Sequence, residues 1–219
     1  MLIVEPPTVL AGFPGPSDLG ASVPPAARIG PNTIIQLAQV LRDRHGEAVA
    51  SQLLFSSTGY AMTALPGAMV DEREAQAFVQ AVMRTFGEQP ATQVLHEAGA
   101  RTADYLMANR IPRPAQWIMK ALPRRAGLAL LLKAMRANAW TFAGSGTFDV
   151  LTTPSGAELT FHACAMCRDM TTAGPVCDFY AGTFERLIRT LIAPQATIRE
   201  VECQATGGHC CRFEVAGIH

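Results

Sequence analysis

The chain divides into two halves by the period of its apolar positions. From residue 31 to about residue 137, apolar residues recur at spacings of three and four, which is typical of amphipathic helices. Asn32 or Thr33 can cap the first helix, and Asp71 heads a charged first turn in another. The spacing predicts helices over residues 32–41, 47–56, 71–87, 91–109 and 124–137. Between the last two of these helices, Pro112, Pro114 and Pro123 break the chain into short pieces.

Short alternating segments replace this pattern after residue 138. They predict strands over residues 140–142, 147–151 and 158–164, then a helix over 177–192, then a hairpin of 197–205 and 209–215 about Gly207 and Gly208. Strands and helices do not alternate, so a doubly wound sheet is not expected. The sequence therefore predicts an α+β fold, with a helical N-terminal half followed by an antiparallel sheet and one long inserted helix.

Composition narrows the class of protein. Of the 219 residues, 49% are hydrophobic and 16% are charged, which excludes a disordered chain. Eighteen basic residues balance eighteen acidic ones, so no net charge attracts nucleic acid. The longest apolar run, residues 126–132, is far shorter than the roughly 20 residues of a membrane span, so at most peripheral membrane contact is expected.

Residues 1–30 stand apart because they contain six prolines and few charges. We expect a Pro/Gly-rich arm there and a single domain over 31–219, made of a helical part (31–137) and a sheet part with the metal site (138–216). The arm has no basic segment before its short apolar start, so a secretory signal is not expected. In a cytoplasmic protein, the six cysteines are thiols or metal ligands rather than disulfides.

Residues 101–136 hold eight basic residues and one acid, with Trp117, Ile118 and Met119 among them. A basic surface with exposed apolar bulk is typical of a membrane interface or of a site for a carboxylate-bearing ligand. The alternative is an ordinary solvated helix face. We expect this segment to border a ligand entrance or a partner interface.

Motifs for a dinucleotide cofactor are missing. Gly144-Ser145-Gly146 is the sole Gly-x-Gly, Asp149 stands where a third glycine is needed, and a predicted strand follows instead of a helix. The sequence contains neither a Walker-type loop nor a Gly-x-Ser-x-Gly elbow. We therefore expect no dinucleotide binding.

The cysteines give the strongest chemical signal. The terminal hairpin places Cys203 opposite Cys211, close enough for both thiolates to bind one zinc ion. Cys177 can join them from the start of the long helix. Glu200 has the wrong strand parity unless the strand bulges, twists or ends there. A rival set pairs Cys164 and Cys167 with Cys203 and Cys211, or with Cys210. His162 and His209 are further possible donors. The alternative to a metal site is that the cysteines are buried thiols of the core.

The C-terminal part resembles the 4-vinyl-reductase-type domain, which bacteriochlorophyll-synthesis proteins, archaeal regulators and the sensor domains of phenol-responsive activators share. The resemblance rests on residues 177–182, on Glu200-Val201-Glu202-Cys203, and on Gly207 and Cys211. The spacing Cys–x22–Glu–x2–Cys–x7–Cys is that of the structural zinc site in the sensor domains. The resemblance therefore implies Zn²⁺ bound by Cys177, Glu200, Cys203 and Cys211. Residues 27–32, the helical half and Cys164-Ala165-Met166-Cys167 extend it, most closely to the bacteriochlorophyll-synthesis members.

This family implies a fold akin to Bet3-type ligand-binding domains and a magnesium tetrapyrrole, such as divinyl protochlorophyllide, as the ligand. Its name implies reduction of the 8-vinyl group, but the residues supply no motif for a reducing cofactor. We therefore expect a tetrapyrrole-binding carrier or accessory protein that works with bacteriochlorophyll-synthesis enzymes, and that can form a homodimer. The alternatives are the vinyl reductase itself and a small-molecule sensor. The expected pocket residues are Trp140, Phe142, Phe148, Phe161, His162 and Tyr180.

Overall fold

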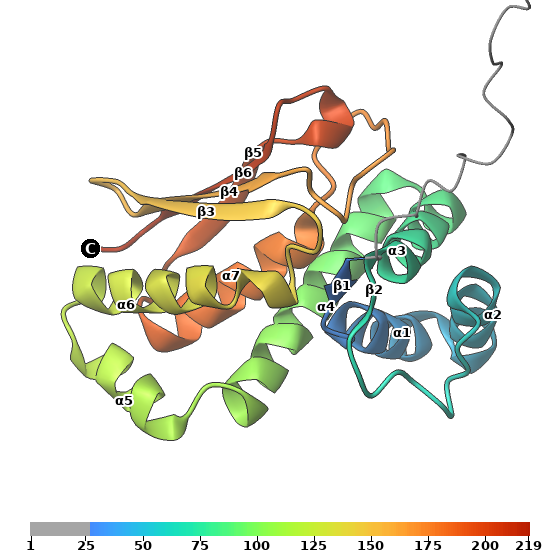
Figure 1. The fold of residues 1–219 in the computed structure, drawn as a ribbon, viewed down its shortest axis with the longest axis horizontal. Helices are drawn as coiled ribbons and strands as arrows, with labels where there is room; N and C mark the ends of the chain where they lie inside the picture. Colours follow the sequence, from blue (N-terminus) through green and yellow to red (C-terminus); the bar gives the residue numbers. More distant parts are fainter. Residues whose placement is uncertain (1–26) are drawn as a thin grey trace, which may run out of the picture.

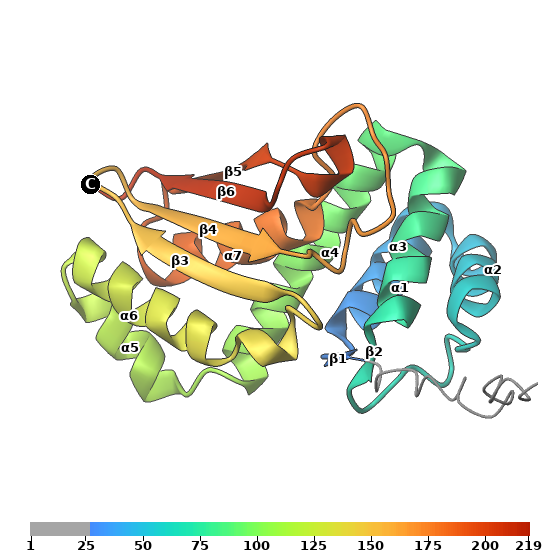
Figure 2. The ribbon, with the colours of Figure 1, turned by 45° about the horizontal axis from the view of Figure 1, so that its top comes forward.

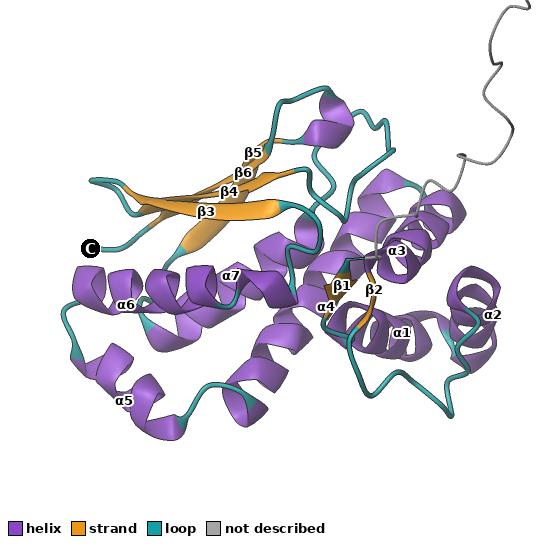
Figure 3. Ribbon diagram, in the orientation of Figure 1, coloured by secondary structure: helices purple, strands orange, loops and turns teal. Residues whose placement is uncertain are grey.

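The computed structural model describes residues 27–219, so residues 1–26 of the predicted arm lie outside the described residues. Figures 1 and 3 show a group of helices beside a small sheet that is covered by helices on one face. The helices confirm the predicted segments to within a few residues, and the short piece between prolines is itself a helix. They are α1 (Asn32–His45), α2 (Glu47–Thr58), α3 (Glu72–Phe86), α4 (Glu88–Asn109), α5 (Arg113–Ala121), α6 (Arg124–Ala137) and α7 (Asp178–Leu191).

The main sheet has four antiparallel strands in the order β3-β4-β6-β5. Their bounds are Thr147–Thr152, Ala157–His162, Cys211–Ala216 and Thr197–Glu202, respectively. α6 and α7 lie against one face of this sheet, as Figure 2 shows. Alternate residues on that face are buried, including Phe161 and Phe213, whereas the other face carries polar side chains. The expected α+β architecture with one long inserted helix is confirmed.

The structure differs from the predicted secondary structure in a few short segments. The strand predicted over residues 140–142 is wrong, because Ala139–Thr141 form a 3₁₀ helix, η1. Both the amide and the hydroxyl of Thr141 donate to the Asn138 carbonyl, which curls the chain. The end predicted for the strand 197–205 is also wrong, since Gln204–Thr206 form a second 3₁₀ turn, η2. A two-residue pair, β1 (Arg28–Ile29) with β2 (Val70–Asp71), was not expected from the pattern.

Contact between α4 and α7 joins the helical half to the sheet half. Two glycines allow the helix backbones to approach each other closely. A Cβ at Gly99 would lie 2.1 Å from the Phe179 carbonyl oxygen, and a Cβ at Gly182 would lie 2.1 Å from that of His96. The Thr183 hydroxyl donates to the Gly99 carbonyl across the same crossing, at 3.1 Å. The two backbones therefore pack directly against each other.

We expect Gly182→Ala to destabilise the protein by about 1–3 kcal/mol, because the methyl group meets backbone that cannot move alone. The gain of about 1 kcal/mol in helix propensity does not offset this overlap. Thermal unfolding measures the effect, with Gly67→Ala as the control because no atom lies within 4 Å of its built Cβ. Equal melting temperatures for the two variants would contradict the direct packing of α4 on α7.

Candidate metal centre

Three cysteines from different elements meet at one end of the sheet. Cys177 immediately precedes α7, Cys203 follows β5, and Cys211 begins β6. Their Sγ atoms lie 4.0 Å (Cys177–Cys203), 3.6 Å (Cys177–Cys211) and 3.9 Å (Cys203–Cys211) apart, and all three residues are fully buried. A tetrahedral zinc with bonds of about 2.3 Å needs sulfur separations of about 3.8 Å. The three thiols therefore already have the spacing of one metal's ligands.

Glu200 joins these thiols because β5 contains a bulge. The pairing of β5 with β6 shifts register between Glu200 and Glu202, and this shift removes the parity conflict that regular alternation predicts. One carboxylate oxygen of Glu200 accepts the Cys177 amide proton at 2.8 Å. The other, Oε1, is buried without a hydrogen-bond partner. An unpartnered buried oxygen beside three thiols is what a metal ligand requires.

Burial raises the pKa of Glu200 to about 9, and the negative charge on Cys203 adds to this shift. Contacts between the thiols have opposite effects on the pKa of Cys203. The Cys167 contact raises the pKa of Cys203, but the Cys177 and Cys211 contacts outweigh it and lower the value to about 6. The raised pKa of Glu200 favours its protonated form while no ion is bound. A divalent cation that binds the carboxylate and the thiolates would displace these protons. Three thiolates and a carboxylate fill a tetrahedral shell, which is typical of a structural site and not of a catalytic one.

Cys164 and Cys167 lie against the same thiols. The Sγ of Cys164 is 3.7 Å from that of Cys177, and the Sγ of Cys167 is 3.3 Å from that of Cys211. Two sets of four residues are therefore close enough to bind an ion, each with ligand atoms within 4.8 Å of one another. One set is Cys177, Glu200, Cys203 and Cys211, and the other is Cys164, Cys167, Cys177 and Cys211.

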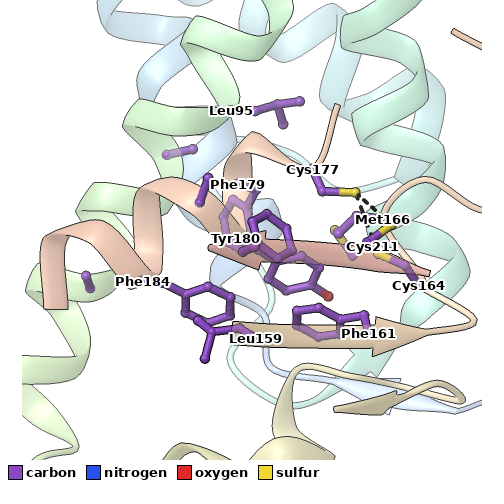
Figure 4. Close-up of a cluster of buried hydrophobic side chains, with 14 of the residues drawn as sticks. Leu95, Leu159, Phe161, Cys164, Met166, Cys177, Phe179, Tyr180, Phe184 and Cys211 are labelled. Atoms are coloured by element: carbon purple, nitrogen blue, oxygen red, sulfur yellow. Dashed lines mark hydrogen bonds between the residues drawn. The ribbon is translucent and has the colours of Figure 1, made fainter. Parts of the chain in front are cut away.

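The rival set expected from spacing differs from the second group, because the structure pairs Cys164 and Cys167 with Cys177 in place of Cys203. Cys210 is buried but belongs to neither set. His162 and His209 are exposed and also belong to neither. Figure 4 shows the Cys164, Cys177 and Cys211 side chains converging at the end of a row of aromatic rings.

An ionic clamp anchors the loop that carries Cys164 and Cys167. Glu72, at the start of α3, accepts hydrogen bonds from the Arg168 guanidinium at 2.7 Å and from the Ser145 amide and hydroxyl at 2.8 and 2.6 Å. Burial would raise the pKa of Glu72, but these donors outweigh it and lower the pKa. The Gln76 side-chain amide binds the Arg168 carbonyl. The sequence pattern did not predict this clamp. It indicated that a helix starts at Asp71, but not that Glu72 contacts Ser145 and Arg168.

The expected pocket residues separate into two groups. Phe148, Phe161 and Tyr180 are buried between the sheet and α7, with Phe161 stacked on Tyr180 at 4.3 Å between ring centroids. Trp140 is 65% exposed, while Phe142 is half-buried at the edge of the same rings. His162 is exposed at the end of β4. The aromatic residues other than Trp140 therefore make one packed cluster, and Trp140 and His162 lie outside it.

Exposed apolar and basic residues gather on α5 and α6. Trp117 is 70% exposed, and Ile118 and Leu122 are exposed beside it. Lys120, Arg124 and Arg125 are exposed on the same two helices. In residues 27–219, no helix combines the length and the hydropathy that crossing a bilayer requires. Trp117 and Ile118 therefore lie on the surface beside basic side chains, as expected, whereas Met119, which was expected among them, is buried in the core.

Comparison with known proteins places the candidate ligand residues inside a known domain family. A family model for the V4R domain matches residues 157–216. The chain is 38% identical over 195 residues to the bacteriochlorophyll synthase 23 kDa chain of Cereibacter sphaeroides, covering 87% of this chain and 91% of the relative. It is 37% identical over 187 residues to the protein of the same name from Rhodobacter capsulatus, covering 85% of each.

Solved structures of H-NOX proteins are similar in fold. One, from a study of haem distortion in the H-NOX family, superposes with a TM-score of 0.56 at 14% identity, covering 87% of this chain and 96% of that chain. Another, an H-NOX protein from S. oneidensis, gives a TM-score of 0.55 at 15% identity, covering 84% and 97%. At such identity the likeness concerns the fold alone.

The identity to the two 23 kDa chains extends over almost their whole length, and the V4R match contains both candidate ligand sets. The chain therefore belongs to the family of the bacteriochlorophyll synthase 23 kDa chains, the 4-vinyl-reductase-type proteins that its cysteine and glutamate spacing resembles.

Proposed function

We propose that this protein binds a magnesium tetrapyrrole, such as divinyl protochlorophyllide, and presents it to the enzymes of bacteriochlorophyll biosynthesis. The observation that carries the proposal is the 38% identity, over 87% of the chain, to a protein named as a chain of bacteriochlorophyll synthase. The likeness in fold to an H-NOX protein studied for its haem supports the ligand class, because haem is also a tetrapyrrole macrocycle.

A carrier suits the residues better than a vinyl reductase does. Hydride transfer needs a reduced cofactor held against the vinyl group. Gly144-Ser145-Gly146 leads into β3, so its amides do not open a helix that could receive a pyrophosphate. A small-molecule sensor remains the further alternative, as in the phenol-responsive activators, and it would need a partner protein to transmit the signal.

The proposed pigment site is the edge of the aromatic cluster near η1. Trp140 and Phe142 are the accessible members of the expected pocket there, and the Phe142 carbonyl accepts a hydrogen bond from the buried Tyr180 hydroxyl at 2.8 Å. A flat macrocycle can stack on such rings. Two hollows on the described surface lie elsewhere, over α4 and α7, and charged side chains such as Arg44, Glu97 and Arg186 line them. These charges suit an apolar pigment less well than the aromatic edge does.

Titration with divinyl protochlorophyllide, followed by absorbance with and without NADPH, tests the carrier proposal. We expect a spectral shift on binding, no conversion, and no effect of NADPH. Trp140→Ala should weaken binding about tenfold, or about 1.4 kcal/mol. Phe55→Ala is the matched control, since Phe55 is equally exposed at 65% but lies on α2. Reduction by the pure protein would establish the reductase instead, and absence of binding would contradict both functions.

The exposed face of α5 and α6 is the proposed border of the pigment entrance. A carrier of an apolar pigment needs an apolar opening that a partner enzyme or a membrane surface can cover. We expect charge reversal at Arg124 and Arg125 (Arg→Glu at both) to slow pigment transfer to the next enzyme or to membranes. Bound metal should stay unchanged, because both residues are exposed and belong to neither candidate set. Unchanged transfer would identify this surface as an ordinary solvated helix face.

Zinc is the proposed structural cofactor, with Cys177, Glu200, Cys203 and Cys211 as ligands. Soft thiolates in a closed tetrahedral shell favour Zn²⁺. The ion would join the start of α7 to β5 and β6, so its loss should release both.

We expect Cys203→Ser to lower the zinc content by one ion per chain and the melting temperature by on the order of 10 °C, because several kcal/mol of binding energy also stabilise the fold. Cys210→Ser is the matched control, a buried neighbouring cysteine outside both sets. Elemental analysis and thermal unfolding measure the two effects. A stable protein that contains no metal as purified would exclude the zinc site.

A further inference from the structure

Cys164 and Cys167 have no role in the proposed zinc site, although their thiols lie against it. Both residues are buried, at 1% and 2% exposure. Cys-x-x-Cys is the spacing with which one loop supplies two ligands to a metal. The loop therefore brings a second pair of ligands to a cluster that already has enough for one ion.

The two ligand sets share two residues, Cys177 and Cys211. Each set then keeps two ligands of its own, Glu200 and Cys203 in one and Cys164 and Cys167 in the other. Six ligands with two of them shared are the number that two tetrahedral ions need when two thiolates bridge them. One thiolate can bind two metal ions because its sulfur has several lone pairs.

We propose that this cluster binds two divalent metal ions of the zinc type, bridged by the thiolates of Cys177 and Cys211. Glu200 and Cys203 complete the first ion's shell, and Cys164 and Cys167 complete the second. The inference extends the proposed single-zinc site and rests on it. Binding of the second ion releases the thiol protons of Cys164 and Cys167 to solvent.

The distances support two tetrahedra that share an edge. The bridging sulfurs of Cys177 and Cys211 lie 3.6 Å apart, and Cys164 lies 3.7 Å from Cys177. Both values are close to the edge of about 3.8 Å for zinc with thiolate ligands. The Cys167–Cys211 separation of 3.3 Å is shorter. A small rotation of the Cys167 side chain would lengthen it to the required edge.

The buried charge also permits a second ion. One divalent ion with three thiolates and a carboxylate has a net charge of about −2 in formal units. A second divalent ion adds two positive charges, and the thiolates of Cys164 and Cys167 add two negative ones. The net charge of the buried cluster is then unchanged, so the second ion adds no uncompensated charge to the core.

The loop around these two cysteines is fixed in a strained conformation. Ala163 and Asp169, on either side of the pair, have φ angles of 53° and 59°, which residues other than glycine rarely adopt. The Cys164 amide donates to the Gln204 side chain at 2.7 Å, and Arg168 is held by Glu72. Strain that surrounding contacts maintain is typical of a functional segment. These contacts hold both thiols against Cys177 and Cys211 before any ion is bound.

The full-length protein, stripped of metal by a chelator, can be titrated with Zn²⁺ and its bound ions counted by native mass spectrometry. We expect saturation at two ions per chain. The double variant Cys164→Ser with Cys167→Ser should bind one, and Cys210→Ser should still bind two. Titration of the wild type with Co²⁺ gives a readout that needs no variant. Thiolate bridges couple the two cobalt spins, so the electron paramagnetic resonance signal should rise with the first equivalent and fall with the second.

Each outcome decides between the proposals. One ion in the wild type, lost in Cys203→Ser but kept in the double variant, would overturn the two-ion cluster and leave the single zinc site intact. No ion in the wild type would overturn both. Two ions without spin coupling would also contradict the bridge, because independent sites would then bind them. Pigment titration is measured separately, so failure of the cluster does not decide the carrier function.

Discussion

The close crossing of α4 and α7 fixes how the helical half of the molecule packs against the sheet half. It brings backbone against backbone, because Gly99 and Gly182 remove the side chains that would separate the two helices. α7 also packs on the sheet, so one helix contacts both halves of the chain. The residue immediately before this helix is Cys177, at the centre of the thiol cluster. The position of the candidate metal ligands therefore follows from how closely two helices approach.

The sequence pattern predicts the long elements well, because periodic burial determines them. The helices 71–87 and 177–192 match α3 and α7 closely, since one apolar stripe marks each. The segment 140–142 has apolar residues that suit a strand, but a local hydrogen bond from Thr141 to Asn138 decides its conformation. A three-residue segment is too short for periodicity to outweigh a single side-chain contact.

The candidate site could be predicted in part for a similar reason. Cys203 and Cys211 meet because they flank one hairpin, which the turn glycines reveal. From the sequence, Glu200 could join the cysteines only if its strand bulged, twisted or ended there. The alternation of residues along the strand could not show that the bulge exists. The approach of Cys164 to Cys177 depends on a loop held by Glu72, which is 96 residues before Arg168. Contacts across such distances leave no periodic signal in one sequence.

The strand order has a consequence for how the chain folds during synthesis. β6 lies between β4 and β5, although it follows both in the sequence. An inner strand is therefore the last of these four to leave the ribosome, and it begins with Cys211. Until then β4 and β5 lack their shared neighbour and α7 has an incomplete surface to pack on, so the sheet half must fold after translation of residue 216. A nascent chain halted before this point would leave Phe161 of β4 and Phe184 of α7 without the Phe213 ring that packs against both of them.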